Sequence, residues 1–364
     1  MKYYIIAGEA SGDLHGSNLI KELKKMDANA SFRAWGGDLM QTAGAMLVKH
    51  YRHLAFMGFA EVIKHLPTIF KNLRFCKHDI LSYQPDALIL IDYPGFNLQL
   101  IRWAKKNKLK VIFYISPQVW AWKENRVRLI KKYVDKMLVI LPFEKAFYKK
   151  WNYDVDYVGH PLVEVVETYK IENRLPATAL QIIALLPGSR LQEIEKKLPV
   201  MLSTSLHFPD YTFIVAKAPG ITKEFYNTFL SSYKNVKISE ETYSILNQAR
   251  AALVTSGTAT LETALFGVPE IVCYKAGAIS YQIAKRLIKL KYISLVNLIM
   301  NKEVVKELIQ NNLTIKNLTQ ELNELLTNET RQHQIKNDYA ELKKILSQGG
   351  NASANAAKII YDYI

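Results

Sequence analysis

Short apolar runs alternate with longer amphipathic stretches along most of the chain. Lys2–Ala7 is such a run, and the glycine-punctuated turn from Gly8 to Gly16 leads from it into a helical pattern that continues to about Met26. Buried parallel strands have continuous apolar sequences, because helices cover both faces of a parallel sheet. The first part of the chain therefore predicts an α/β fold with a doubly wound sheet. Its expected strands are residues 2–7, 31–35, 86–91, 110–115, 135–141 and 155–158.

The same alternation restarts in the second half of the chain. Between residues 164 and 178 the sequence is polar and lacks periodicity, so we expect an interdomain linker there. Two domains of similar size follow, residues 1–165 and 178–345, which suits a length of 364 residues. From residue 303 onward the pattern is helical, and residues 346–364 are apolar enough to need a docking surface, which we expect on the first domain. The expected strands of the second domain are residues 181–186, 211–217, 236–238, 251–254 and 269–274.

Charge and composition narrow the class of protein. Lys and Arg exceed Asp and Glu by 48 to 33, and the excess is concentrated between Arg102 and Lys136. Such a face would attract nucleic acid, an anionic membrane surface or phosphorylated substrates. No apolar run approaches the ~20 residues that span a bilayer, and Cys76 and Cys273 are too few and too far apart for a disulfide framework or a cysteine metal site. We expect an intracellular, soluble protein with reduced thiols.

A turn in the second domain has the features of a phosphate site. Ser256, Gly257 and Thr258 follow an apolar strand and open a helix, and Glu262 comes one helical turn later. A helix start presents free N–H groups and the positive end of the helix dipole, so it would hold a phosphate, while Glu262 would accept hydrogen bonds from a ribose diol. An ordinary helix cap with a surface glutamate would have the same sequence.

Arg190 strengthens the nucleotide interpretation. It stands at the turn after the strand at 181–186, and parallel strands bring this turn and the Ser256 turn to one edge of the sheet. A guanidinium can grip a diphosphate through two parallel hydrogen bonds.

Polar side chains also follow the strands of the first domain. Asp92 comes directly after the strand at 86–91, with Asn97 at the start of the next helix, so Asp92 is a candidate general base or a turn aspartate. Ser11 stands in the first turn of the chain, where it would serve a ligand or a helix cap. Trp120, after the strand at 110–115, would line an acyl or sugar pocket or pad its loop.

One segment of the first domain is unusually apolar for a loop. Residues 53–59 contain several large apolar side chains, and an amphipathic helical pattern with lysines and an arginine follows them to about Leu73. This combination would dock on a membrane or hold an apolar substrate, although core packing explains the helical stripe equally well.

Nine motifs along the chain, taken together, resemble the lipid-A-disaccharide synthases. They cover residues 6 to about 310 in the order seen in that family. The motifs are Gly8-Glu-Ala-Ser-Gly-Asp-Leu-His-Gly16, Trp35-Gly-Gly37, Met57-Gly-Phe-Ala-Glu-Val62, Ile91-Asp-Tyr-Pro-Gly-Phe-Asn97, Ser116-Pro-Gln-Val-Trp-Ala-Trp122, Gly159-His-Pro-Leu162, Leu186-Pro-Gly-Ser-Arg190, Thr255-Ser-Gly-Thr-Ala-Thr-Leu-Glu262 and Leu295-Val-Asn-Leu298.

This resemblance implies a glycosyltransferase of the GT-B architecture, with two Rossmann-like domains facing across a cleft. The donor it implies is UDP-2,3-diacylglucosamine and the acceptor is 2,3-diacylglucosamine 1-phosphate, joined β-1,6 by an inverting displacement that releases UDP. It further implies a peripheral place on the anionic inner-membrane surface, no nucleic-acid partner and a homodimer. No metal or other cofactor is expected, because no acidic pair with metal-ligand spacing lies near the phosphate motifs.

The resemblance also assigns roles to residues. Asp92 matches the aspartate implicated in catalysis, and Arg190 matches an arginine needed for activity and nucleotide binding. The implied nucleotide-side residues are Ser256, Gly257, Thr258, Glu262, Asn297 and Gln310. On the acceptor and acyl side they are Glu9, Ser11, Met57, Phe59, Glu61, Val62, Asn97 and Trp120.

Two triplets depart from the usual family pattern, and some alternatives stay open. Leu295-Val296-Asn297 replaces Leu-Pro-Asn, and Val305-Lys306-Glu307 stands before the later glutamine, so acyl-chain length and local geometry are in doubt rather than the reaction.

Glu9 or Glu61 would also serve as the base. The competing functions are another GT-B enzyme that uses a UDP-N-acetylhexosamine, a UDP-sugar 2-epimerase, and a basic adaptor without catalysis.

Overall fold

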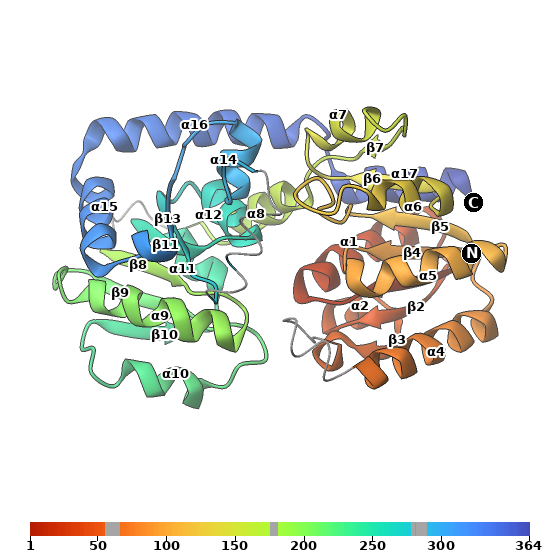
Figure 1. The fold of residues 1–364 in the computed structure, drawn as a ribbon, viewed down its shortest axis with the longest axis horizontal. Helices are drawn as coiled ribbons and strands as arrows, with labels where there is room; N and C mark the ends of the chain where they lie inside the picture. Colours follow the sequence, from red (N-terminus) through yellow and green to blue (C-terminus); the bar gives the residue numbers. More distant parts are fainter. Residues whose placement is uncertain (55–65, 175–180, 278–280, 282–289) are drawn as a thin grey trace. The chain divides into compact units, whose positions relative to one another are not determined.

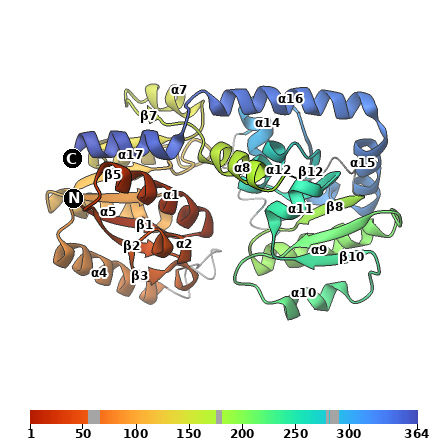
Figure 2. The same ribbon diagram turned by 180° about the vertical axis from the view of Figure 1, so that it is seen from behind.

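The computed structural model describes residues 1–54, 66–174, 181–277, 281 and 290–364, which form two compact units (Figures 1 and 2). Unit 1 comprises Met1–Pro161 together with Ser347–Ile364, and unit 2 comprises Leu162–Leu346.

The linker expected over residues 164–178 was wrong in its first part, because Pro161–Glu172 forms helix α8. Tyr169 of this helix packs edge-on against Tyr243 and Phe266 of unit 2, with ring centroids 5.4 and 5.9 Å away, and these aromatic contacts stabilise the helix.

Unit 1 is built on a seven-stranded parallel sheet in the order β3-β2-β1-β4-β5-β6-β7. Its central strands are the expected apolar runs, and helices lie on both faces, which confirms the doubly wound prediction. The strands are β1 Lys2–Ala7, β2 Ser31–Gly36, β3 Met46–His50, β4 Ala87–Ile91, β5 Lys110–Tyr114, β6 Lys136–Val139 and β7 Asp156–Tyr157. The helices are α1 Ala10–Met26, α2 Asp38–Thr42, η1 Tyr51–His53, α4 Leu66–Tyr83, α5 Pro94–Lys106, α6 Arg126–Tyr133, α7 Glu144–Lys149 and α17 Ala352–Tyr363.

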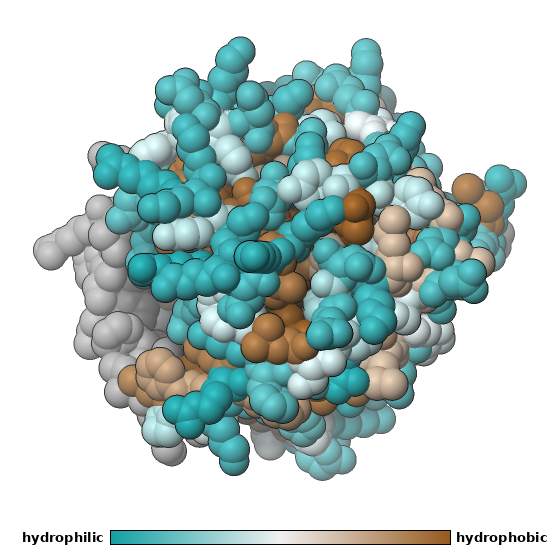
Figure 3. Space-filling view, turned by 90° about the vertical axis from the view of Figure 1, so that its right-hand side faces the viewer, coloured by the Kyte–Doolittle hydropathy of each residue, from teal (hydrophilic) through white to brown (hydrophobic). Residues whose placement is uncertain are grey.

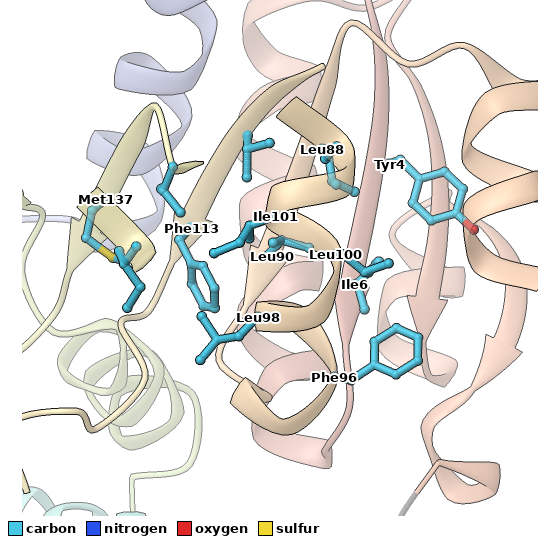
Figure 4. Packing of buried hydrophobic residues seen from close by; sticks show 14 of the residues in the cluster. Tyr4, Ile6, Leu88, Leu90, Phe96, Leu98, Leu100, Ile101, Phe113 and Met137 are labelled. Atoms are coloured by element: carbon cyan, nitrogen blue, oxygen red, sulfur yellow. The ribbon is translucent and has the colours of Figure 1, made fainter. Parts of the chain in front are cut away.

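The core of unit 1 forms where α5 covers the sheet (Figure 4). Leu100 and Ile101 of α5 are fully buried, as are Leu88 and Leu90 of β4 and Phe113 of β5. Each buried aliphatic or aromatic side chain of this size contributes about 1.5–3 kcal/mol to the folded state. This packing holds the carboxyl ends of β1, β4 and β5 in fixed positions.

The last helix completes unit 1 from the far end of the chain. α17 packs along α1, and Lys110 Nζ donates hydrogen bonds to the main-chain oxygens of Tyr363 (3.3 Å) and Ile364 (2.6 Å). Where the chain returns to unit 1, Gly349 lies directly against the backbone of Gly159, so closely that neither position has room for a Cβ atom. Asn355 Nδ2 ties the two segments by donating to the carbonyl of Val158 at 3.1 Å.

Unit 2 has a six-stranded parallel sheet in the order β10-β9-β8-β11-β12-β13. The sequence prediction missed its edge strand β13, just as it missed β3 at the edge of unit 1, and treated residues after 303 as helical throughout. The strands are β8 Ile182–Leu186, β9 Thr212–Ala216, β10 Val236–Ser239, β11 Ala251–Thr255, β12 Glu270–Tyr274 and β13 Lys306–Ile309. The helices are α9 Leu191–Ser205, α10 Lys223–Leu230, α11 Thr242–Gln248, α12 Thr258–Phe266, α14 Leu295–Met300, η2 Gln310–Asn312, α15 Ile315–Thr327 and α16 Glu329–Ser347.

The strand order identifies one binding edge in each unit. In an open α/β sheet, ligands bind beyond the carboxyl ends of the strands at the point where the strand order reverses. That point lies between β1 and β4 in unit 1 and between β8 and β11 in unit 2.

Candidate functional site

Two carboxylates meet at the reversal point of unit 1. Ala7 and Ile91 are register partners in β1 and β4, so Glu9 and Asp92 leave neighbouring strands at the same edge. Burial and the nearby charge of Glu9 raise the pKa of Asp92 from 3.8 to about 7, while the backbone N–H of Tyr93 opposes the shift. A carboxylate with a pKa near neutrality is suited to general base catalysis.

The backbone around Asp92 is strained. Asp92 and Tyr93 have φ angles of +42° and +48°, and Ile115, after the adjacent strand β5, has +66°. Non-glycine residues rarely adopt this left-handed conformation, and for a β-branched residue it is a clear outlier. Asn97 stabilises the turn, because its Nδ2 donates to the carbonyl oxygen of Asp92 at 2.8 Å, and the Asp92 N–H donates to the carbonyl of Ile115 at 3.2 Å. Strain of this kind clusters at functional sites.

A glycine lets the two strand ends approach each other. The Tyr93 ring lies so close to Gly8 that a Cβ atom at Gly8 would overlap the ring carbons. The Tyr93 hydroxyl donates to the carbonyl of Leu54 at 3.0 Å, which fixes the ring in this position. The glycine-punctuated turn after β1 therefore serves close packing beside Asp92.

The other predicted acceptor-side residues differ in what they can reach. Ser11 is exposed in the first turn of α1, whereas Asn97 is fully buried and acts on the Asp92 backbone. Trp120 is half-buried after β5, with its ring edge-on to Phe143 at 4.9 Å. Met57, Phe59, Glu61 and Val62 lie outside the described residues.

The polar residues of the first turn also have structural roles. Asp13 caps α2 by accepting hydrogen bonds from the N–H groups of Gly37, Leu39 and Met40. Burial lowers the pKa of His15 to about 4, and burial with the neighbouring His15 lowers that of His160 to about 3. Both imidazoles are therefore neutral at pH 7.

Two helix N-termini meet at the reversal point of unit 2. α9 follows β8 and α12 follows β11, and these strands are neighbours in the sheet. Arg190 is the N-cap residue of α9, and its Nη1 pairs with Glu193 Oε1 at 2.8 Å. Gly257 caps α12 with a φ of +146°, which favours glycine, and Thr258 behind it is exposed. Backbone N–H groups, a hydroxyl and a guanidinium thus share one edge, as phosphate binding requires.

A polar clamp fixes the Ser256 turn. The Ser256 hydroxyl donates to the carbonyl of Ile293 at 2.8 Å, so its proton is already engaged. Glu307 of β13 accepts hydrogen bonds from the N–H groups of Ile293 and Ser294 and from Asn297 Nδ2, all within 3.2 Å. Asn297 is fully buried, and its Oδ1 accepts from the N–H groups of Val304 and Val305. In this arrangement Asn297 positions the turn rather than presenting its amide to a ligand.

The remaining nucleotide-side residues are oriented by their own unit. Tyr243 of α11 donates to Glu262 Oε1 at 2.8 Å, and burial raises the pKa of Glu262 while this hydrogen bond opposes the increase. Gln310 begins η2 with a φ of +54°, and its Oε1 accepts from the N–H of Ala276 at 2.9 Å.

Sequence reasoning missed Tyr243 and Glu307 as partners of the site. Tyr243 carries no motif, and only its place on α11 brings it to Glu262. Glu307 belongs to the unpredicted strand β13, where it stands between Lys306 and Leu308. Within the described part of the chain, no cluster of His, Cys, Asp and Glu side chains is arranged to hold a metal ion, and no helix has the length and apolarity needed to cross a bilayer.

Comparisons with known proteins agree with the resemblance. The family model of lipid-A-disaccharide synthetase matches residues 3–361. The lipid-A-disaccharide synthase of Geobacter metallireducens is 37% identical over 371 residues, covering 99% of this chain and 96% of its own. That of Coxiella burnetii is 36% identical over 374 residues, covering 99% and 98%.

Solved structures show the same fold at low sequence identity. The UDP-GlcNAc 2-epimerase of Neisseria meningitidis, bound to UDP-GlcNAc, has a TM-score of 0.67 at 13% identity and covers 100% of this chain and 99% of its own. The calicheamicin glycosyltransferase CalG4 has a TM-score of 0.62 at 16% identity, covering 100% and 97%. These likenesses confirm the expected pair of Rossmann-like domains of the GT-B architecture.

Proposed function

Because the chain belongs to the lipid-A-disaccharide synthase family, a family of glycosyltransferases in lipid A biosynthesis, we propose that it joins UDP-2,3-diacylglucosamine to 2,3-diacylglucosamine 1-phosphate through a β-1,6 bond and releases UDP. One observation carries the proposal: a carboxylate of raised pKa stands at the reversal point of unit 1, and two helix N-termini with Arg190 stand at that of unit 2. We assign the acceptor to unit 1 and the sugar nucleotide to unit 2.

The first step of the proposed mechanism is activation of the acceptor. Asp92 accepts the proton of the 6-hydroxyl as its oxygen attacks the anomeric carbon of the donor. The strained turn and Asn97 hold the backbone of Asp92 in place. Burial and the charge of Glu9 raise the pKa of Asp92 to about 7, so the carboxylate is a stronger base than an ordinary aspartate, half-ionised at pH 7 and ionised at higher pH.

The second half of the step is departure of UDP. As the new C–O bond forms, the bond between the anomeric carbon and the diphosphate oxygen breaks, and negative charge builds on the diphosphate. Arg190, the Thr258 hydroxyl and the N–H groups at the α12 N-terminus are suited to stabilise that charge. Displacement from the opposite face inverts the anomeric centre. We propose no essential metal ion, because these groups supply the positive charge that the leaving group needs.

Ribose recognition is assigned to Glu262. Its Oε1 accepts a hydrogen bond from the Tyr243 hydroxyl, so Oε2 is left to accept hydrogen bonds from the sugar hydroxyls. Asn297 and Gln310 support the same site indirectly, since each holds a loop segment through backbone hydrogen bonds.

Helix α4 of unit 1 is the surface that we propose for contact with the anionic membrane. Phe70 is 61% exposed and Phe75 is 47% exposed, and Lys71 and Arg74 lie beside them on the helix. Exposed aromatic side chains next to basic ones are typical of helices that bind the headgroup region of a bilayer. On the face shown in Figure 3, hydrophilic side chains cover most of the surface and hydrophobic ones form separate patches, which suits peripheral contact rather than insertion.

Incubation with the two acylated substrates tests the proposal. We expect UDP and a disaccharide phosphate in equal amounts, with and without EDTA. Absence of product with both substrates present would refute the proposed reaction. Product that forms without EDTA and is lost when EDTA is added would refute its independence from metal ions.

A further inference from the structure

A buried lysine lies behind Arg190. Lys197 is two turns further along α9 and is only 2% exposed. Its ammonium forms one ion-pair contact among the described residues, to Glu193 Oε2 at 3.9 Å, which is too long for a direct hydrogen bond. A charged group this deep in a protein is costly unless it is paired, so an ammonium whose nearest carboxylate in the described chain is 3.9 Å away suggests that a second state of the site satisfies it.

Glu193 is shared between two cations. Its Oε1 pairs with Arg190 at 2.8 Å, and its Oε2 faces Lys197. Gly188 makes this possible, because a Cβ atom there would come within 2.5 Å of Glu193 Oε2. The carboxylate therefore sits in the space that a side chain at position 188 would fill, with the shorter contact on the Arg190 side.

Exposure divides the three residues into a solvent-facing end and a buried end. The Arg190 side chain is 43% exposed, so a ligand at the sheet edge can reach it, whereas that of Lys197 is 3% exposed and is out of reach. If Arg190 leaves Glu193 for a diphosphate, the carboxylate would remain unpaired beside a polyanion unless another cation replaces Arg190. A shift of about 1 Å toward Lys197 would give a hydrogen-bonded ion pair of ordinary length.

We propose that Arg190, Glu193 and Lys197 form an ion-pair exchange: Arg190 leaves Glu193 for the diphosphate of the sugar nucleotide, and Lys197 then pairs with Glu193. Lys197 is a positioning residue in this scheme, since it acts on the ligand through Glu193. Burial lowers the pKa of Lys197, and closer pairing with Glu193 would reverse part of that effect. The inference rests on the proposed nucleotide site of unit 2.

The test is UDP binding by titration calorimetry to the full-length protein and four variants. We expect Lys197→Met to weaken binding about five- to twentyfold, because Glu193 then holds Arg190 back. Glu193→Gln should bind at least as tightly as the parent, and adding Glu193→Gln to Lys197→Met should restore affinity to within about threefold of the parent. Lys196→Met removes an exposed charge from the neighbouring position and should leave affinity unchanged.

The outcomes separate the exchange from the site itself. Failure of the parent to bind UDP refutes the proposed nucleotide site. If the parent binds and Lys197→Met binds equally well, the exchange is refuted. A double variant as weak as Lys197→Met also refutes it, because a merely structural defect would not be rescued by removing Glu193. Thermal unfolding of each variant verifies that the protein tested is folded.

Discussion

Replacement of Asp92 by Asn tests the base most directly. The φ of +42° at this position favours Asn, which adopts the left-handed conformation readily, whereas Ala would add backbone strain. The hydrogen bond from Asn97 goes to the backbone oxygen of residue 92, so it survives the substitution. The variant therefore removes the ionisable oxygen and leaves the turn intact.

The expected magnitude follows from the pKa of about 7. Relative to an ordinary aspartate, a base roughly three pKa units stronger is about 30-fold more reactive at a Brønsted coefficient of about 0.5, and half-ionisation at pH 7 costs a factor of about two. Loss of the whole base should lower kcat by roughly 10²–10⁴. KM for the donor should change little, because Asp92 is not part of the proposed nucleotide site.

The assay is the initial rate of UDP release from pH 5.5 to 9. The parent kcat/KM should rise with pH and level off above about 7, as Asp92 loses its proton. Glu9→Gln removes the neighbouring like charge, so the rising limb should move to lower pH. Asp92→Asn should lack this limb. Near-normal turnover in Asp92→Asn, or an unchanged limb near pH 7 in that variant, would refute the assignment.

Three further predictions concern other parts of the chain. Tyr243→Phe removes the hydrogen bond to Glu262, which should raise the Glu262 pKa further. UDP binding should weaken about threefold to tenfold below pH 7 and less at pH 9. Equal weakening at all pH values would contradict a role through that carboxylate. Glu270 is fully buried, its carboxyl oxygens have no hydrogen-bond partner in the described chain, and burial raises its pKa well above 4.5, so its contribution to stability is present below pH 4.5 and is lost as pH rises toward the folded-state pKa. Glu270→Gln should abolish this loss, which is about 1.4 kcal/mol for each unit by which the pKa is raised. Urea unfolding at pH 5 and pH 8 measures the change in unfolding free energy with pH, and an equal change in the parent and the variant would contradict the prediction. Gly349→Ala places a Cβ atom against the Gly159 backbone and should destabilise unit 1 by about 2–4 kcal/mol, whereas Gly95→Ala, where a Cβ meets nothing within 4 Å, should be neutral; equal melting temperatures would contradict the close packing.

Much of the fold could be predicted from local sequence. β4 and β11 are continuous apolar runs because helices cover both faces of their sheets, and such runs stand out in any sequence. β3 and β13 lie at edges of their sheets and escaped prediction, whereas the edge strands β7 and β10, with Val155–Val158 and Val236–Ile238 in their sequences, were recognised. An edge strand can carry residues such as Lys306 and Glu307, which make it resemble a helical surface.

The candidate site was predictable in position but not in detail. Asp92 and Arg190 each follow a strand, and the rule for parallel sheets places such residues at the binding edge. Tertiary contacts decide the rest. Glu9 raises the Asp92 pKa only because β1 and β4 are paired, and the Asn297 amide is fully hydrogen-bonded to Glu307 of β13 and to the backbone just before it. No local pattern contains those distances.

The division of unit 1 between the two ends of the chain has a consequence for synthesis. Its sheet lies within residues 1–161, but α17, which packs on α1, is translated only after residues 162–346. At 5–20 residues per second, roughly ten to forty seconds separate the two parts on the ribosome. Throughout that interval the face of α1 that α17 will bury is open to water, and unit 2 can fold before unit 1 is complete. We therefore expect the nascent chain to be prone to aggregation until α17 emerges.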